Sequence, residues 1–199
     1  MGSAIVRFRS QSNNAAAGIW NIGAVPRTSS LVSDFIFQSR TANSTYSELA
    51  RFSGNGGITF NGDTATANAL DDYEEGTFQV TLSSTGGRFV ATVGNTTGHY
   101  IKIGRQVTCH WYSSTLNISN IGSGTSRING LPFVAANTGD LYPVARFSHT
   151  TAFTTPTNGG YVSFNSSVIV PTVDDSSSQA QWIAGNPRYV MFSASYIAA

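Results

Sequence analysis

The sequence predicts an all-β protein built from antiparallel sheets, and three observations support this class. Apolar residues alternate with polar ones along most of the chain, which is the period of a strand with one buried face. Clusters of Gly, Asn, Ser and Thr, such as "STGG", "GNTTG" and "TPTNGG", separate these stretches and are typical of turns. Helical periodicity is nearly absent, and its strongest candidate, Ser44–Phe52, fits a strand about as well. Many strands without interposed helices favour an antiparallel sandwich or barrel.

Residues 1–71 are predicted to form a short, repetitive β-rich shaft. The segment Val6–Asn14 is echoed by Phe35–Asn43, and Leu49–Thr64 continues with brief strands and tight Gly/Asn turns. A segment with such short strands struggles to bury a core alone, whereas self-similar β units bury one by stacking on neighbours. We therefore expect a homo-oligomer in which this segment stacks as a shaft or pairs between chains.

Residues 72–199 are predicted to form a C-terminal antiparallel β-sandwich. The stretch "TFQVTL" places Phe78 and Val80 on one face, and "RYVMFSASYIA" places Phe192 and Tyr196 on one face. Turn clusters separate these runs. The stretch "GYVSFNSSVIV" alternates in the same way, and its residues on one face are Val162, Phe164, Val168 and Val170. This domain is expected to carry the binding function.

Composition narrows the classes of partner. Only 11% of the residues are charged, 40% are hydrophobic, and the net charge is +1 with Lys102 as the only lysine. A nucleic-acid binder needs a basic stripe, so no nucleic-acid partner is expected. No apolar run approaches the roughly 20 residues of a membrane span, so no membrane insertion is expected. The sole cysteine, Cys109, is expected to be a small buried residue.

Several stretches, in this order, resemble parts of bacteriophage proteins. "LARFSGNGGITFNGD" is similar to the short β repeats that precede the tip domain in tail fibres. "ALDDYEEGTFQVTL", "GHYIKIGRQVT" and "INGLPF" together resemble a recurring C-terminal layout of such fibres and of other phage receptor-binding proteins. These three span Ala69–Phe133, and the sequence from Val134 onward resembles nothing distinct.

The resemblance implies a parallel homotrimer, with a β shaft followed by a jelly-roll-like tip. It implies an extracellular place in the virion tail fibre, contact with other virion tail proteins, and attachment to a host bacterial surface glycan. Two features depart from the pattern. The given sequence shows no long N-terminal region to anchor a fibre, so we expect that either a piece is missing or a partner supplies the anchor, and it shows no recognisable C-terminal self-cleaving chaperone. Two alternatives stay open: a purely structural virion fibre or decoration protein that grips other virion proteins, and a glycan-degrading tailspike.

The segment "ALDDYEEGTF" gathers four carboxylates in a chain poor in charge. A glycosidase pair must flank a groove at roughly 5–9.5 Å, and a calcium loop interleaves carboxylates with other oxygen ligands and a Gly. The segment fits neither pattern, although an irregular metal site on a trimer axis stays open. We expect a structural junction between shaft and tip, or else a solvated linker, formed by Asp71, Asp72, Glu74 and Glu75.

Arg105 is the expected partner of these carboxylates. It falls on the apolar-facing register of a predicted strand Ile101–Trp111, unless Gly104 marks a bulge that resets the register. A buried guanidinium is costly when unpaired, and its planar fork fits a carboxylate.

No catalytic, cofactor-binding or metal-ligating residue is predicted, so the protein is expected not to be an enzyme. His99, His110 and His149 lie outside nucleophile motifs and do not have zinc spacing. The Gly-rich stretches match neither phosphate-binding pattern.

Glycan-binding residues are expected among aromatic and polar side chains near turns of the late C-terminal domain. Aromatic rings stack on the C–H faces of sugars, polar groups bond the hydroxyls, and loops on a rigid scaffold carry such sites. The alternative for each aromatic residue is a place in the core or the subunit interface. The candidates are Tyr142, Phe153, Asn158, Tyr161, Asp174, Asp175, Trp182, Asn186, Arg188 and Tyr189. Tyr112 and His110, on the polar-facing register of the predicted Ile101–Trp111 strand, are further candidates.

Overall fold

The computed structural model describes residues 4–9, 19–26, 32–42, 45–65, 68–139, 142–174 and 176–199. These residues form strands, turns and irregular segments, with no α-helix among them. The chain divides into two compact units, unit 1 at Met1–Asp72 and unit 2 at Tyr73–Ala199. The division lies one residue from the boundary expected from the sequence.

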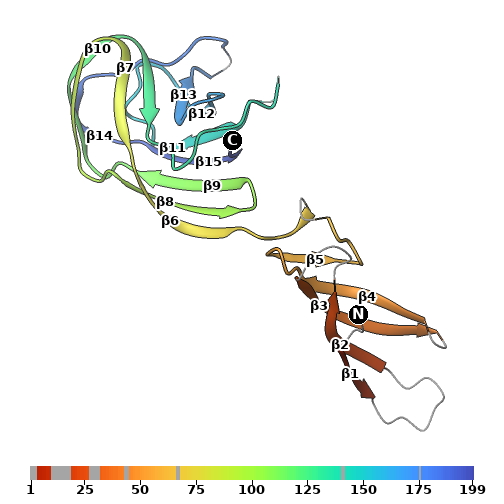
Figure 1. The fold of residues 1–199 in the computed structure, drawn as a ribbon. Helices are drawn as coiled ribbons and strands as arrows, with labels where there is room; N and C mark the ends of the chain where they lie inside the picture. The colour runs from red at the N-terminus through yellow and green to blue at the C-terminus, as the bar shows by residue number, and fades with distance from the viewer. Residues whose placement is uncertain are drawn as a thin grey trace. The chain divides into compact units, whose positions relative to one another are not determined.

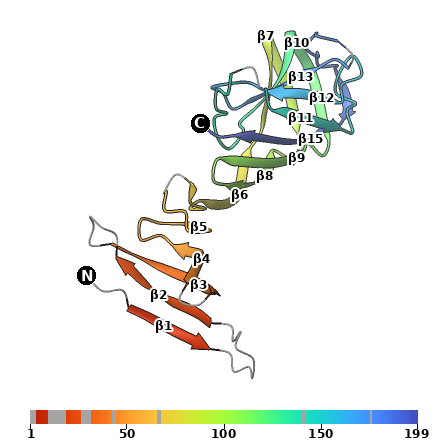
Figure 2. The ribbon, with the colours of Figure 1, turned by 90° about the vertical axis from the view of Figure 1, so that its right-hand side faces the viewer.

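Unit 1 is a five-stranded antiparallel sheet in which neighbours in sequence are neighbours in space (Figure 2). Its strands are β1 (Ala4–Arg9), β2 (Ile19–Pro26), β3 (Ser33–Ala42), β4 (Thr45–Phe52) and β5 (Ile58–Phe60).

A charged network holds β3 to β4 in unit 1. The Arg51 guanidinium donates to both oxygens of Glu48, at 2.6 and 2.5 Å, and to Asp34 Oδ2 at 2.6 Å. The other oxygen of Asp34 accepts the Gly54 amide at 2.9 Å, and the Asp34 side chain is 1% exposed. The hydrogen bonds to Glu48 raise the pKa of Arg51, with Asp34 adding to the shift. The network therefore satisfies a buried carboxylate that would be costly alone.

Unit 2 is one antiparallel sheet that curls into a half-barrel around its core (Figure 1). The strand order is β14-β10-β13-β12-β11-β15-β9-β8-β6, and β7 pairs with β10. The strands are β6 (Tyr73–Gln79), β7 (Thr81–Val93), β8 (Thr97–Ile103), β9 (Gln106–Tyr112), β10 (Leu116–Asn129), β11 (Val144–Ser148), β12 (Gly159–Val162), β13 (Val168–Thr172), β14 (Gly185–Arg188) and β15 (Met191–Ile197).

The core of unit 2 follows the two-residue alternation of its strands. In β9 and β15 every second side chain is buried, including Cys109 and Tyr196, while the residues between them face outward. Burial raises the pKa of the Cys109 thiol to about 12, which keeps it protonated. The alternation predicted for Val190–Tyr196 is confirmed, because Phe192, Ala194 and Tyr196 are all buried.

The single strand predicted at Ile101–Trp111 is wrong, because this stretch is a hairpin. Gly104 takes a φ of 55° and forms a two-residue turn with Arg105, so that Ile103 pairs with Gln106. Paired residues share a face, so a two-residue turn shifts the alternation by one position. Ile101 and Ile103 consequently face outward, on the side opposite Val107, Cys109 and Trp111.

The expected burial of Arg105 is wrong for the same reason. Arg105 lies in the turn and is exposed, and its Nε donates to the backbone oxygen of Ala198 at 2.9 Å. The carboxylates on β6 have hydroxyl partners instead: Glu74 accepts from Tyr100, and Glu75 accepts from Tyr73 at 3.2 Å. These hydrogen bonds raise the pKa of both tyrosines. Asp71 is exposed and Asp72 half-buried, both in unit 1.

The stretch Gly160–Val170 is likewise a hairpin, of β12 and β13. Val162 pairs with Ile169 and both are fully buried, so Ile169 takes the core position that the alternation assigned to Val168.

Trp182 and Phe153, two of the glycan-binding candidates, lie in the core of unit 2. Their rings stack at 4.9 Å, they are 1% and 6% exposed, and Trp182 Nε1 donates to Ser83 O at 2.7 Å. The Phe89 ring also packs against Trp182, with ring centroids 5.7 Å apart. Both candidates are corrected to core residues, because neither ring offers a face to a ligand.

Replacing Trp182 tests this core. Trp182→Ala removes a large buried ring, and we expect it to lower the free energy of unfolding of unit 2 by about 3–5 kcal/mol in urea titrations. Trp182→Phe keeps a ring in contact with Phe89 and Phe153 and is expected to lose less. A loss below about 1 kcal/mol for the alanine variant would contradict the core assignment.

Replacing Asp34 tests the charged network of unit 1. Asp34→Ala leaves Arg51 paired with Glu48 but removes the acceptor of Arg51 Nη1 and of the Gly54 amide, and we expect a loss of about 1–3 kcal/mol in the stability of unit 1. The matched control is Asp71→Ala, an exposed carboxylate of the same unit, with an expected change within about 0.5 kcal/mol. Thermal unfolding at a fixed protein concentration measures both, and equal effects would show that the network contributes nothing.

Candidate functional site

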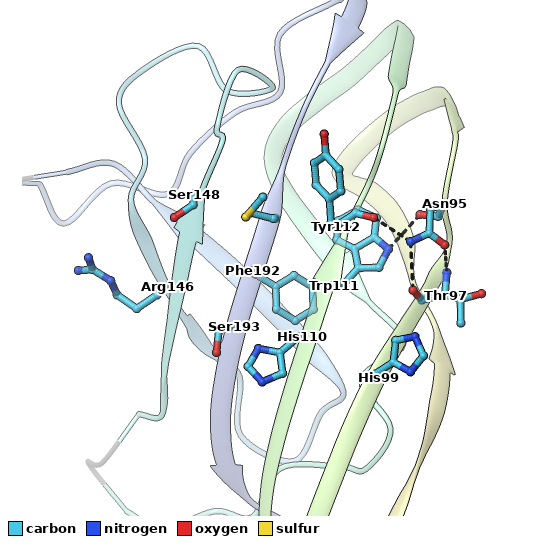
Figure 3. A pocket seen from close by; sticks show the side chains of 11 residues that line it. Asn95, Thr97, His99, His110, Trp111, Tyr112, Arg146, Ser148, Phe192 and Ser193 are labelled. Carbon is cyan, nitrogen blue, oxygen red and sulfur yellow. Dashed lines mark hydrogen bonds between the residues drawn. The ribbon is translucent and has the colours of Figure 1, made fainter.

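The outer face of unit 2 carries a concavity with a volume of about 500 Å³ (Figure 3). It crosses four neighbouring strands, β8, β9, β15 and β11. Its lining residues are Asn95, Thr97, His99, His110, Trp111, Tyr112, Arg146, Ser148, Met191, Phe192 and Ser193. We call this concavity the outer groove.

The strand register places the lining residues in rows across the sheet. His99 pairs with His110, His110 with Ser193, and Ser193 with Arg146. Neighbouring strands lie about 4.8 Å apart, so this row spans roughly 15 Å of polar surface. Figure 3 shows the four side chains coming from successive strands.

A second row lies beside the first and is more apolar. Tyr112 pairs with Met191, and Met191 pairs with Ser148. Beneath both rows the buried rings of Trp111 and Phe192 pack at 5.8 Å. The outer groove therefore offers hydroxyl, imidazole and guanidinium groups beside an aromatic and aliphatic strip.

Asn95 fixes the end of the outer groove near β8. Its backbone oxygen accepts Trp111 Nε1 at 2.9 Å, and its Nδ2 donates to Tyr112 O at 2.9 Å. Its Oδ1 accepts the Thr97 amide at 3.0 Å. These contacts hold the backbone around Tyr112 and Thr97 in one geometry before any ligand arrives.

An aromatic stack extends from Tyr112. The His149 ring lies 5.8 Å from Tyr112 and 4.3 Å from Tyr189, at interplanar angles of 22° and 8°. His149 has a φ of 51°, in the left-handed region that Asn, Asp and His adopt more readily than other residues with side chains. Thr151 Oγ1 accepts the backbone amide of Tyr189 at 2.9 Å, which holds the backbone that carries this ring. Tyr112 thus belongs both to the outer groove and to the stack.

The charge of the outer groove is positive. Arg146 is a permanent cation, His99 and His110 are further nitrogen donors, and no described lining residue is acidic. Glu75 is the nearest acidic position by register, one row further along, where it pairs with Ile101. The outer groove therefore suits neutral or anionic polar ligands.

Among the glycan-binding candidates that are not buried, Tyr189 comes close to the outer groove, through the stack with His149. The further candidates His110 and Tyr112 line the groove itself. Tyr142 is 53% exposed and stacks on Phe164 at 4.1 Å, away from the groove lining.

The other candidates make hydrogen bonds within unit 2. Tyr161 lies edge-on to Tyr142 and accepts Gln179 Nε2 at 3.2 Å. Asn158 donates its amide and its Nδ2 to the two carboxylate oxygens of Asp174, at 2.7 and 2.5 Å.

Two further candidates, Asn186 and Arg188, lie on β14. Arg188 donates to Ala184 O and Thr151 O, so its guanidinium ties two loops together. Asn186 is exposed. Asp175 lies outside the described residues.

Among the described residues, no group of three or more His, Cys, Asp or Glu side chains could hold a metal ion. The described part of the chain also contains no helix with the length and apolar character to cross a membrane.

The chain was compared with family models, with curated proteins and with solved structures, and none of the three comparisons gave a match.

Proposed function

We propose that this chain is the end of a phage tail fibre and that it attaches the virion to a saccharide of the host cell surface. The observation that carries the proposal is the outer groove, where a polar row lies beside Tyr112 and its aromatic stack. A pyranose ring has one face that is more apolar than the other, and hydroxyl groups around its rim. The aromatic rings of this surface can pack on the apolar face while its polar groups hydrogen-bond the hydroxyls. The motifs spanning Ala69–Phe133 supply the phage context.

In this proposal, unit 1 is the end of the shaft and unit 2 is the tip of a parallel homotrimer. Single saccharide sites on shallow surfaces bind weakly. Three copies on one fibre raise the effective affinity by avidity without new contacts. Host surface glycan, other virion tail proteins and further copies of the chain are the proposed partners, outside the cell.

A binding module fits the outer groove better than a hydrolase does. Glycoside hydrolysis needs two carboxyl groups about 5–9.5 Å apart. The described residues that line the outer groove include neither Asp nor Glu.

Tyr112 gives the sharpest test. Tyr112→Ala removes the ring shared by the outer groove and the stack, and we expect at least a tenfold loss in saccharide affinity, about 1.4 kcal/mol. The matched control is Tyr73→Ala: Tyr73 is 65% exposed on β6 of the same sheet and does not line the groove. The measurement is a glycan array with the full chain, followed by titration of the best saccharide.

Two outcomes would contradict the proposal. If no surface saccharide binds the folded wild-type chain, the proposed function fails. If Tyr73→Ala weakens binding while Tyr112→Ala does not, the function holds and the outer groove is the wrong site.

A further inference from the structure

The sheet of unit 1 has one strongly apolar face. Pairs in register share a face, and the pairs Phe8–Trp20, Ala24–Phe35, Phe35–Phe52 and Ala50–Phe60 all belong to this one. No registered pair on this face includes a charged residue. Six apolar side chains of this face that are 43–62% exposed are Val6, Phe8, Trp20, Phe35, Phe52 and Phe60. We call this surface the apolar face.

The opposite face of the same sheet is covered by its own chain. Ile36 and Thr59 are only 2% and 3% exposed there. Thr59 Oγ1 donates to Asp63 O at 2.5 Å, which brings the turn after β5 onto this side, and Asp34 accepts the Gly54 amide. Local turns thus cover this face over β3 and β5, whereas the apolar face is left to water.

The size of the apolar face matches a subunit interface. An aromatic side chain buries 150–250 Å², so five half-exposed rings and Val6 leave on the order of 600 Å² in water. That is at the upper end of the roughly 300–600 Å² found for the largest patch on a monomer. A standard interface takes about 800 Å² from each partner, so the apolar face supplies most of one.

We infer that the apolar face is the surface through which copies of this chain associate, each packing this face against the same face of its neighbours. A different partner would be selected by charges or hydrogen-bonding groups, and the registered pairs of this face include no charge. Association between identical copies needs no such charged or hydrogen-bonding groups, because every copy presents the same surface. Sheets pack face to face about 10 Å apart, which lets the exposed rings interdigitate.

This inference does not depend on saccharide binding, since the outer groove lies on unit 2. It assigns the self-association expected from the sequence to named side chains.

The first test compares the solution mass of the full chain with that of two variants, by light scattering at micromolar concentration. Phe8→Lys combined with Phe60→Lys places a charge on each edge strand of the apolar face, and we expect the mass to fall to that of a monomer. The control is Ile5→Lys, because Ile5 is 45% exposed on the same strand β1 but on the opposite face. The control is expected to keep the wild-type mass.

The second test needs no variant. Of the three tryptophans, Trp111 and Trp182 are 4% and 1% exposed, whereas Trp20 is 49% exposed and lies on the apolar face. Self-association must shield Trp20, so acrylamide should quench little of the fluorescence at micromolar concentration. Dilution that dissociates the oligomer should expose about one-third of the tryptophans to the quencher.

Several results would overturn the inference. A wild-type monomer at micromolar concentration would do so, whether Trp20 is quenched freely or is shielded by another part of the same chain. An oligomer in which Trp20 is freely quenched would also do so. An oligomer that persists in the folded double lysine variant would show that another surface joins the copies. If the double variant does not fold, as judged by far-UV circular dichroism, the quenching of wild-type Trp20 decides.

Discussion

Strict alternation of side chains across antiparallel strands is the constraint on which the rest of this structure depends. In unit 2 the inward half of each strand fills the core of a curled sheet, with Val107, Cys109 and Trp111 from β9 meeting Phe192 and Ala194 from β15. The outward-facing residues of the same strands do not fill the core and can therefore be polar. The outer groove exists because the register aligns these outward residues in rows.

The two units use this alternation differently. Unit 2 curls until its inner face is sealed, so its outer face can be polar and available to a ligand. Unit 1 has too few strands to curl, and its own turns cover one side only. Its other side keeps a row of rings, including Phe35 and Phe52, that water solvates poorly. In the proposed fibre, unit 1 joins the copies and unit 2 binds the saccharide. Self-association through unit 1 therefore brings several weak sites of unit 2 together and raises the effective affinity.

The sequence predicted the class of the fold and some of its faces, and the failures have definite physical causes. The alternation at Val190–Tyr196 is correct because no turn interrupts it. At Ile101–Trp111 it fails, because a turn as short as Gly104–Arg105 leaves the apolar pattern unbroken while it reverses the faces. The burial expected for Arg105 failed with it. Gly104, considered only as a bulge, was the available signal for the turn.

The candidate site was harder to predict than the fold. Proximity to turns selected Trp182 and Phe153, but rings of that size were needed to fill the core. The residues of the outer groove come from four strands whose register only the folded chain defines, so His99, Arg146 and Ser193 gave no local signal. His110 and Tyr112 were visible as polar-register residues, and Tyr189 as an aromatic residue near a turn.

The chain's three histidines give the most direct test of the proposal that a surface saccharide binds in the outer groove. His99 and His110 line the groove and His149 stacks on Tyr112, so every imidazole of the chain lies at the site. The measurement is the shift of the histidine ring resonances in NMR spectra when polysaccharide is added. The polysaccharide is purified from bacterial cells to which the protein binds. We expect the resonances of all three imidazoles to shift together while the indole N–H resonance of buried Trp182 does not. Saturable binding that leaves the three imidazole resonances in place would contradict this proposal.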